Sequence, residues 1–414
     1  MPTYDQMTVQ RARFAVESTT FGDDLTDDVA TNFFDLRHEP IKFIPKTDMV
    51  QDTTVVQRAF EQRNDVLGPS RASAACTFMW TGTNEALNAA ASPTKRAQSK
   101  LMEALLGGYN AAAGSVTASG EATTGAVVTG GQGSRFTEGT IIGITVAGVI
   151  YPRLVTSRST DTLVWWPALP AAPANGAVIL NSQSIFLTDT PATQIQMLFE
   201  AAKQRGNIWT GLGGWGDFSM DFTRGGLAKW SSTLNFTDYE HDDELDVPQG
   251  GSAIALASYD DTGPIVVSKG GCHFGASSSS TLSLVRCAGL TVNFAREFFD
   301  VGLHSGVEGR TEPELNSRTR RTLEITLLKP DPYEDYWEAH QAQTNYGLLF
   351  WLDGGAGGTQ RTVCVPTMQI CAEPEPVEAF GMEGLKISCL IKESNKASAQ
   401  TAEVQRSPIV IGMT

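Results

Sequence analysis

Cysteine and long apolar runs are both scarce in this sequence. It has 6 Cys in 414 residues, none with the CxxC spacing of a zinc or redox motif. Several of them lie in apolar, strand-like segments, so we expect buried free thiols rather than disulfides. The longest apolar stretch, residues 141–151, is too short for a transmembrane helix and contains glycines. Residues 1–16 lack the apolar core of a signal peptide, so we expect a soluble protein kept in the cytoplasm, with no membrane partner.

Positive charge is scarce as well. Lys and Arg number 31 against 46 Asp and Glu, which gives a formal net charge of −15. A protein that grips nucleic acid needs a concentrated basic field, so this balance argues against a general nucleic-acid-binding surface. The 40 Gly, the 19 Pro and the 41% hydrophobic content are typical of a folded, turn-rich chain.

Recognisable catalytic and cofactor motifs are missing. No His lies in an HExxH motif, and no GxSxG nucleophile elbow occurs. Gly211, Gly213 and Gly216 spell GxGxxG, but they follow a predicted helix and precede an alternating strand, which reverses the order of a dinucleotide-binding unit. We interpret this cluster as a turn, and the acidic segment at 238–246, which lacks a calcium-loop template, as a solvated loop. The sequence therefore predicts no catalytic residue, no cofactor and no metal site.

The predicted secondary structure is mainly β. Apolar and polar residues alternate over residues 218–222 and again, after a turn at 224–226, over residues 228–237. This period predicts two antiparallel strands, each with one buried and one wet face. Shorter runs with the same alternation lie at residues 290–294, 323–327 and 385–389.

Three helices are predicted among these strands. Apolar residues at helical spacing favour helices over residues 93–107 and 191–204. A third candidate, at 332–341, begins with Pro and is rich in acids near its start, as helix N-termini prefer. We expect its Tyr336 and Trp337 to dock on a sheet.

The chain divides into a main unit and an insertion. β-rich runs at 41–45 and 76–80 flank a long polar arm, residues 46–73, which we expect to touch another molecule. The Ala- and Gly-rich stretch at 111–133 has the composition of a linker. Four β-like runs within residues 136–189 favour a small inserted β-barrel or sandwich. The predicted domains are residues 1–115 with 190–414, and the insertion 116–189.

Trp165 and Trp166 allow two interpretations. Aromatic faces stack on sugar rings, so the pair could belong to a carbohydrate site together with Trp215. We favour the other interpretation, a core or interface pair.

The order of these parts resembles the major tail tube proteins of long-tailed bacteriophages. The opening RARFAVESTTFG looks like the first strand and turn of that family, and the strand, arm and strand of residues 41–80 look like its stacking loop. Residues 217–236 resemble the central hairpin in the tube wall, and residues 136–187 a small β insertion of longer members. The closing segments LEITLLKPDPYEDYWEA, YGLLFWLDGG and VPTMQI look, in that order, like the final strands and helix of the family.

The resemblance implies a β-sandwich or half-barrel tail-tube fold with flanking helices and an inserted β domain. Such subunits form stacked hexameric rings through which DNA passes without specific binding. It also implies the tape-measure, terminator and distal tail proteins as partners, assembly in the host cytoplasm and a place in the virion tail. The expected lumen-facing residues are Asp217, Asp221, Thr223, Ser231, Thr233 and Asn235. The expected inter-ring residues of the arm are Asp48, Gln51, Arg58, Glu61, Arg63 and Asp65.

Other functions stay open at this point. A carbohydrate-binding or adhesin protein could use the same β architecture, and another tail ring protein, a distal tail or terminator subunit, would share most of these patterns. A glycosidase ranks last, because the sequence selects no pair of carboxylates.

Overall fold

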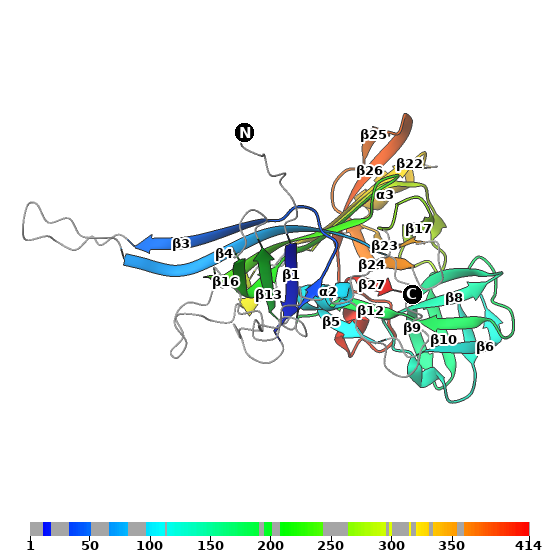
Figure 1. Cartoon of the computed structure of the whole chain (residues 1–414). Coiled ribbons are helices and arrows are strands. Elements are labelled where there is room, and N and C mark those ends of the chain that lie inside the picture. Colours follow the sequence, from blue (N-terminus) through cyan, green and yellow to red (C-terminus); the bar gives the residue numbers. More distant parts are fainter. Residues whose placement is uncertain are drawn as a thin grey trace, which may run out of the picture.

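The computed structural model describes most of the chain, and the described residues are mainly β (Figure 1). Among them, a continuous sheet contains 19 strands, a separate closed barrel is built from β6 to β11, and β20 pairs with β21. None of the described helices is long and apolar enough to cross a membrane. The described residues are 11–17, 33–50, 66–81, 97–111, 114–189, 194–200, 208–242, 264–294, 298–299, 314–315, 320–330, 334–353 and 360–413.

Strand β16 (Lys229–Asp242) is the junction of the large sheet. It pairs with β4 on one edge, and on the other edge with β15 near its start and β14 over the rest. From β14 the sheet continues through β13 and β1 to β2, and from β4 it continues to β3. The bounds are β1 (Arg11–Val16), β2 (Phe34–Asp35), β3 (Lys42–Val50), β4 (Val66–Met79), β13 (Ile195–Glu200), β14 (Ile208–Gly216) and β15 (Phe218–Thr223).

Beyond β15 the same sheet runs through β19, β22 and β26 to β24. There it branches, with β23, β17 and β18 on one side and β27, β12 and β5 on the other, while β25 pairs with the start of β26. The bounds are β5 (Gly107–Asn110), β12 (Gln183–Leu187), β17 (Gly270–Ala276), β18 (Ser283–Leu284), β19 (Cys287–Phe294), β22 (Arg321–Leu328), β23 (Asn345–Leu352), β24 (Arg361–Ile370), β25 (Glu375–Ala379), β26 (Met382–Ile391) and β27 (Val410–Met413). The short strands outside this sheet are β20 (Phe298–Phe299) and β21 (Glu314–Leu315).

One core cluster joins the different branches of this sheet. Phe222 of β15 contacts Phe350 of β23, with ring centroids 5.0 Å apart, and Phe78 of β4 stacks on Trp230 at 4.2 Å. The predicted apolar faces of residues 218–222 and 228–237 are buried in this cluster, which confirms the alternation. Because side chains alternate along a strand, the polar residues between them point to the opposite face.

Two predicted helices are confirmed and one is wrong. Helix α2 (Ala97–Leu106) lies within the predicted 93–107, and α3 (Glu334–Gln341) within 332–341. Tyr336 of α3 packs against the sheet as expected, with its ring centroid 6.0 Å from that of Phe274. The third described α-helix is short, α4 (Glu403–Arg406).

The predicted helix at 191–204 contains strand β13 instead. Its residues Ile195 to Phe199 are all buried, on both faces of the strand, between β1 and β14. A short run that is buried on both faces has no two-residue alternation, so its pattern cannot be distinguished from that of a buried helix.

The predicted turn at Gly211 to Gly216 is also wrong, because these residues belong to β14. Phe236 of β16 lies over the glycines: a Cβ on Gly211 would come within 2.7 Å of its ring, and one on Gly214 within 2.6 Å. The glycines therefore make room for an aromatic side chain of the neighbouring strand, a use of glycine inside strands. The acidic segment also differs from its prediction, because residues 238–242 extend β16 and residues 243–246 lie outside the described part.

The barrel lies at one end of the molecule, in the cyan and green part of Figure 1. Its strand order is β10-β7-β6-β11-β8-β9. The stretch 111–133, predicted as a linker, contributes β6 and β7, whereas β12, inside the predicted insertion, pairs with β27 and β5 of the large sheet. The bounds are β6 (Ser115–Ala122), β7 (Gly125–Val128), β8 (Ile141–Val146), β9 (Val149–Ser159), β10 (Thr162–Trp166) and β11 (Val178–Asn181), with a 3₁₀ turn at Gly133–Arg135.

Two β-hairpins project from the body of the large sheet. The β3–β4 hairpin extends as a long ribbon on the side away from the barrel, and the β25–β26 hairpin projects in another direction (Figure 1). The sequence predicted strands only at 41–45 and 76–80, but the ladder continues to Val50 and starts again at Val66. The flanks of the predicted arm are therefore regular β-structure.

Gly214→Ala is expected to lower the free energy of unfolding by about 1–3 kcal/mol, the usual cost of overpacking. The added methyl group would overlap the Phe236 ring and lie 2.5 Å from the Ile195 carbonyl oxygen. Gly289→Ala in β19 is the matched control, because the nearest atom to its Cβ would be 3.9 Å away. Denaturant unfolding compares the two variants, and equal stability would contradict the packing of Phe236 on β14.

Candidate functional site

The side chains of β15, β16, β19 and β22 that point away from the core form one continuous surface, which we call the polar face. Strand register brings them side by side: Ser219 pairs with Ser231 of β16 and with Asn293 of β19, and Asp221 pairs with Thr291. Thr291 in turn pairs with Glu324 of β22. The polar face consists of Asp217, Ser219, Asp221, Thr223, Lys229, Ser231, Thr233, Asn235, Thr291, Asn293, Thr322 and Glu324.

The structure brings all six predicted lumen residues together on this face. The Thr233 backbone N–H donates to the Asp217 carboxylate, which fixes the residue before β15 against β16. The Thr223 hydroxyl donates to Asp221 Oδ1 at 3.2 Å, and the hydroxyls of Ser219 and Ser231 are 2.9 Å apart. These bonds order the polar side chains, while their place in a lumen stays a prediction.

Sequence reasoning missed the other members of the polar face. The alternation at 290–294 and 323–327 was visible, but it does not tell which strands are neighbours. Only the pairing of β15 with β19, and of β19 with β22, adds Thr291, Asn293 and Glu324 to the surface.

Two lysines at the polar face are held in ion pairs. Lys229 of β16 is paired with Glu39, and Lys386 of β26 with Glu324 at 3.0 Å. Such half-exposed pairs contribute little to stability, about 0–1 kcal/mol. Their effect here is on the net charge of the surface. Each lysine is matched by one carboxylate, and Asp217 and Asp221 add two further negative charges. The polar face is thus rich in hydroxyls and amides, and its two lysines are matched by carboxylates. Lys42, Lys46 and Arg71 lie beyond it on the same side of the sheet, across β4 and β3.

The predicted inter-ring residues lie almost entirely outside the described part of the chain. Asp48 belongs to the described backbone of β3. The positions outside the described residues are Gln51, Arg58, Glu61, Arg63 and Asp65. Their role stays a prediction.

Trp165 and Trp166 are buried, which confirms the core or interface interpretation. They are 2% and 4% exposed, and each indole N–H donates to a backbone carbonyl, of Thr123 at 2.9 Å and Ser279 at 2.8 Å. Trp165 belongs to the barrel core, and Trp166 to a cluster that joins the barrel to the large sheet. Neither ring offers a free face to a sugar. Trp215, partly exposed, pairs with Asn235 at the margin of the polar face.

The cysteines are free, as predicted, and most are buried. Burial raises the pKa of the Cys76 thiol to about 12, so it is not a nucleophile at neutral pH. Burial also lowers the pKa of His273 to about 4, with a smaller contribution from the charge of Arg153. Its neutral ring stacks on Trp351 with centroids 5.2 Å apart, which is a structural role.

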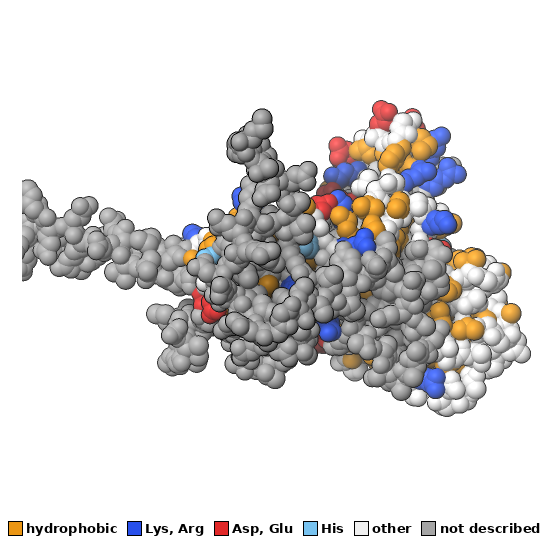
Figure 2. Space-filling view, viewed as in Figure 1, with side chains coloured by type: hydrophobic (Ala, Val, Ile, Leu, Met, Phe, Trp, Pro, Cys, Tyr) orange, Lys and Arg blue, Asp and Glu red, His pale blue; other side chains and the backbone are white. Residues whose placement is uncertain are grey.

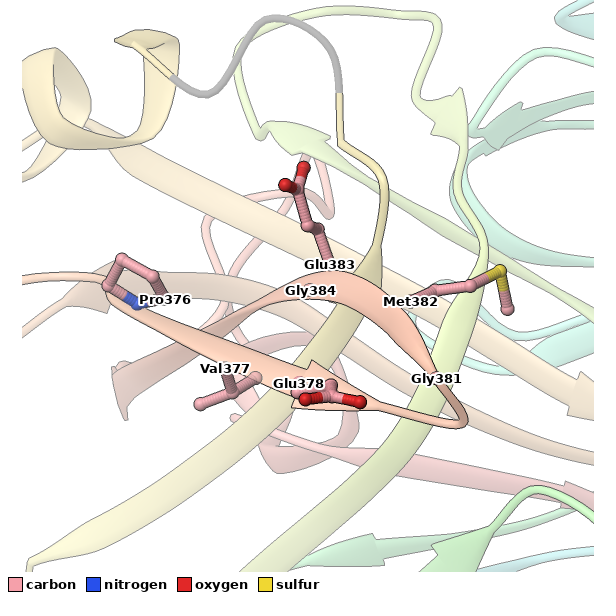
Figure 3. A pocket seen from close by; sticks show the side chains of 7 residues that line it. All are labelled: Pro376, Val377, Glu378, Gly381, Met382, Glu383 and Gly384. Carbon is pink, nitrogen blue, oxygen red and sulfur yellow. The ribbon is translucent and has the colours of Figure 1, made fainter.

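Two pockets lie on the described surface, and both are lined by carboxylates. One, of about 540 Å³, is formed by the β25–β26 hairpin, with Glu378 and Glu383 as its ionisable residues (Figure 3). The other, of about 200 Å³, is lined by Arg321, Arg406 and several acids, and Arg406 lies 3.6 Å from Glu393. Neither lining includes His or Cys, and the described residues contain no cluster of three or more His, Cys, Asp or Glu that could hold a metal ion.

A comparison with known protein families finds no family model that matches the chain, and a comparison with curated proteins finds no match. Function is therefore inferred from the polar face, the projecting hairpins and the charge balance.

Trp166→Ala is expected to lower the free energy of unfolding by about 3–5 kcal/mol, because it empties the junction between the barrel and the sheet. Val164→Ala is the control in the same strand, where the side chain is 39% exposed and truncation costs less than about 1 kcal/mol. Denaturant unfolding measures both. A Trp166 variant as stable as the wild type would contradict the role of this indole in the junction.

Proposed function

We propose that this protein is a structural subunit of a bacteriophage tail tube, which self-assembles into stacked hexameric rings and forms a conduit for DNA. The observation that carries the proposal is the polar face, which spans four neighbouring strands of one sheet whose other face is buried. A tube wall needs such a surface, wet on one side and free of excess cations. DNA can pass along it without being held, because Lys229 and Lys386 are each paired with a carboxylate and the face adds further carboxylates.

Open strand edges support assembly. Among the described residues, β3 pairs only with β4, and β25 only with β26. Unpaired edges are a liability in a monomer, since they can pair with other chains. In a ring, the sheet of each subunit would continue into that of its neighbour, and the open edge strands would form hydrogen bonds with strands of the next subunit. In this proposal the subunit resides in the virion tail and assembles in the host cytoplasm with other tail proteins.

The burial of Trp165 and Trp166 speaks against the carbohydrate-binding alternative, because it removes two of its three proposed stacking rings. A distal tail or terminator protein shares the polar face and the open edges. Such a protein would differ from a tube subunit in its assembly, which would stop at a single ring.

Negative-stain electron microscopy over a concentration series, with light scattering for mass, tests the proposal without assuming a ligand. The expected result is sixfold rings that stack into hollow tubes of uniform bore. Single rings that never stack would favour the distal tail or terminator role. A monomer at every concentration would contradict the self-assembling tube.

Lysines placed on the polar face should make the assembled protein retain DNA. Thr223→Lys with Thr233→Lys adds two positive charges per subunit at exposed positions of the polar face. Val127→Lys with Val149→Lys adds the same charge on the barrel exterior, where these side chains are 42% and 52% exposed. Each added cation near phosphate strengthens binding and its salt dependence.

The measurement is co-sedimentation of the assembled variants with linear double-stranded DNA at several salt concentrations. Strong retention by the first variant and weak retention by the second is expected, because only the first surrounds DNA with the new charges. Equal retention by both would contradict the assignment of the polar face to the bore.

A further inference from the structure

Two cysteines from different strands of the large sheet lie next to each other. Cys272 belongs to β17, and Cys287 begins β19. The Val285 backbone N–H donates to the Cys272 carbonyl oxygen at 2.8 Å, which holds the chain just before Cys287 against β17. Val285 and Cys287, two residues apart, both pack on the core cluster that contains Cys272. The two thiols therefore lie on the same side of this contact.

The two thiols are hydrogen-bond partners. The bond with Cys287, together with burial, raises the pKa of the Cys272 thiol well above its usual value. The Cys287 thiol in turn donates to the Gly289 carbonyl oxygen at 3.2 Å. Because Cys287 uses its proton for that bond, the Cys272 thiol is the donor toward the Cys287 sulfur.

Burial gives the two sulfur atoms different access to solvent. Cys272 is 3% exposed, and a buried thiol with a raised pKa reacts poorly with dissolved oxidants. Cys287 is only half-buried, so an oxidant reaches its sulfur first. An oxidised Cys287 would then have the Cys272 sulfur beside it as a resolving group.

We propose that Cys272 and Cys287 are the site of a reversible disulfide, which forms when the protein meets a peroxide. Hydrogen peroxide oxidises the Cys287 thiol to a sulfenic acid and is itself reduced to water. The Cys272 sulfur then attacks the Cys287 sulfur, the S–O bond breaks, and the hydroxyl group leaves as water with the proton of the Cys272 thiol. A dithiol reductant reverses the link by thiol–disulfide exchange.

The disulfide would close a loop that seats the barrel on the large sheet. Figure 1 shows β17 on the side of the sheet nearest the barrel. Within the loop, the Ser279 carbonyl oxygen accepts from the Trp166 indole N–H at 2.8 Å, and the Ser280 carbonyl oxygen accepts from the Ala168 N–H at 2.7 Å. A covalent link between the ends of a loop restricts the unfolded chain, so it stabilises the folded one.

This loop contacts the barrel through hydrogen bonds and packing. Residues 276–285 contain no charged side chain, and Figure 2 shows mainly uncharged side chains on the visible face of the barrel. One cation takes part: Lys396 donates to the Ser277 carbonyl oxygen and lies 4.6 Å from the centroid of the Trp166 ring. The disulfide would add a covalent link at a place where the loop has no charge of its own to form an ion pair.

Tryptic mapping of the oxidised whole chain tests the disulfide. Trypsin cleaves after Lys269, Arg286 and Arg296, so the two cysteines fall on separate peptides, residues 270–286 and 287–296. The reduced protein is treated with hydrogen peroxide, its remaining thiols are alkylated, and the digest is analysed by mass spectrometry without reductant. The expected product is one species that joins both peptides, lighter than their sum by two hydrogen atoms, which dithiothreitol separates.

Single variants identify the sulfur that meets the oxidant. Cys287→Ser should abolish the linked species and leave the Cys272 thiol free for alkylation. The matched control is Cys371→Ser, which removes another half-buried cysteine and should leave the linked species unchanged. Conversion of Cys287 to a sulfinic acid while Cys272 stays free would overturn the proposal. A pair that stays reduced at a peroxide concentration that oxidises the same cysteines in the denatured chain would overturn it as well.

Thermal unfolding of the oxidised and reduced forms measures the effect on the loop. Peroxide treatment is expected to raise the melting temperature of the wild type and of Cys371→Ser, but not that of Cys287→Ser, which controls for oxidation at other residues. A linked wild-type chain that melts no higher than its reduced form would contradict the stabilising role. Neither experiment needs assembly, so the result is independent of the proposed function.

Discussion

Strand β16 pairs with β4, β14 and β15, and its register with them fixes which side chains enter the core and which form the polar face. A shift of one residue would turn Trp230 and Leu234 outward and bury Ser231 and Thr233. The cost of exposing that apolar surface, about 1.5–3 kcal/mol for each large side chain, holds the register. The same register aligns β15 with β19, so the polar face is a consequence of how the core is packed.

The sequence was most informative where one face of a strand is buried and the other is wet. The alternation around Phe218 and Trp230 predicted both strands, their turn and their faces, and the amphipathic patterns of α2 and α3 located these helices. The pattern led to a wrong prediction at β13, because its residues are buried on both faces. It also led to a wrong prediction at β14, whose glycines make room for Phe236 of another strand. The six candidate residues of the polar face followed from alternation, whereas Asn293 and Glu324 could be added only from strand pairing.

Ion pairing sets the charge of the polar face. On the polar face, Lys229 and Lys386 are matched by carboxylates. In the proposed tube, this arrangement would suit a wall along which DNA moves. The buried Trp166, at the junction of barrel and sheet, shows that the barrel is packed against the large sheet at this point.

A cryo-electron-microscopy reconstruction of the self-assembled protein, at a resolution that traces the strands, tests the central claim most directly. The account predicts sixfold rings in which β15, β16, β19 and β22 line the bore, with Thr233 and Asp221 pointing into it. An assembly with these side chains on its outer surface, or buried between subunits, would contradict the account.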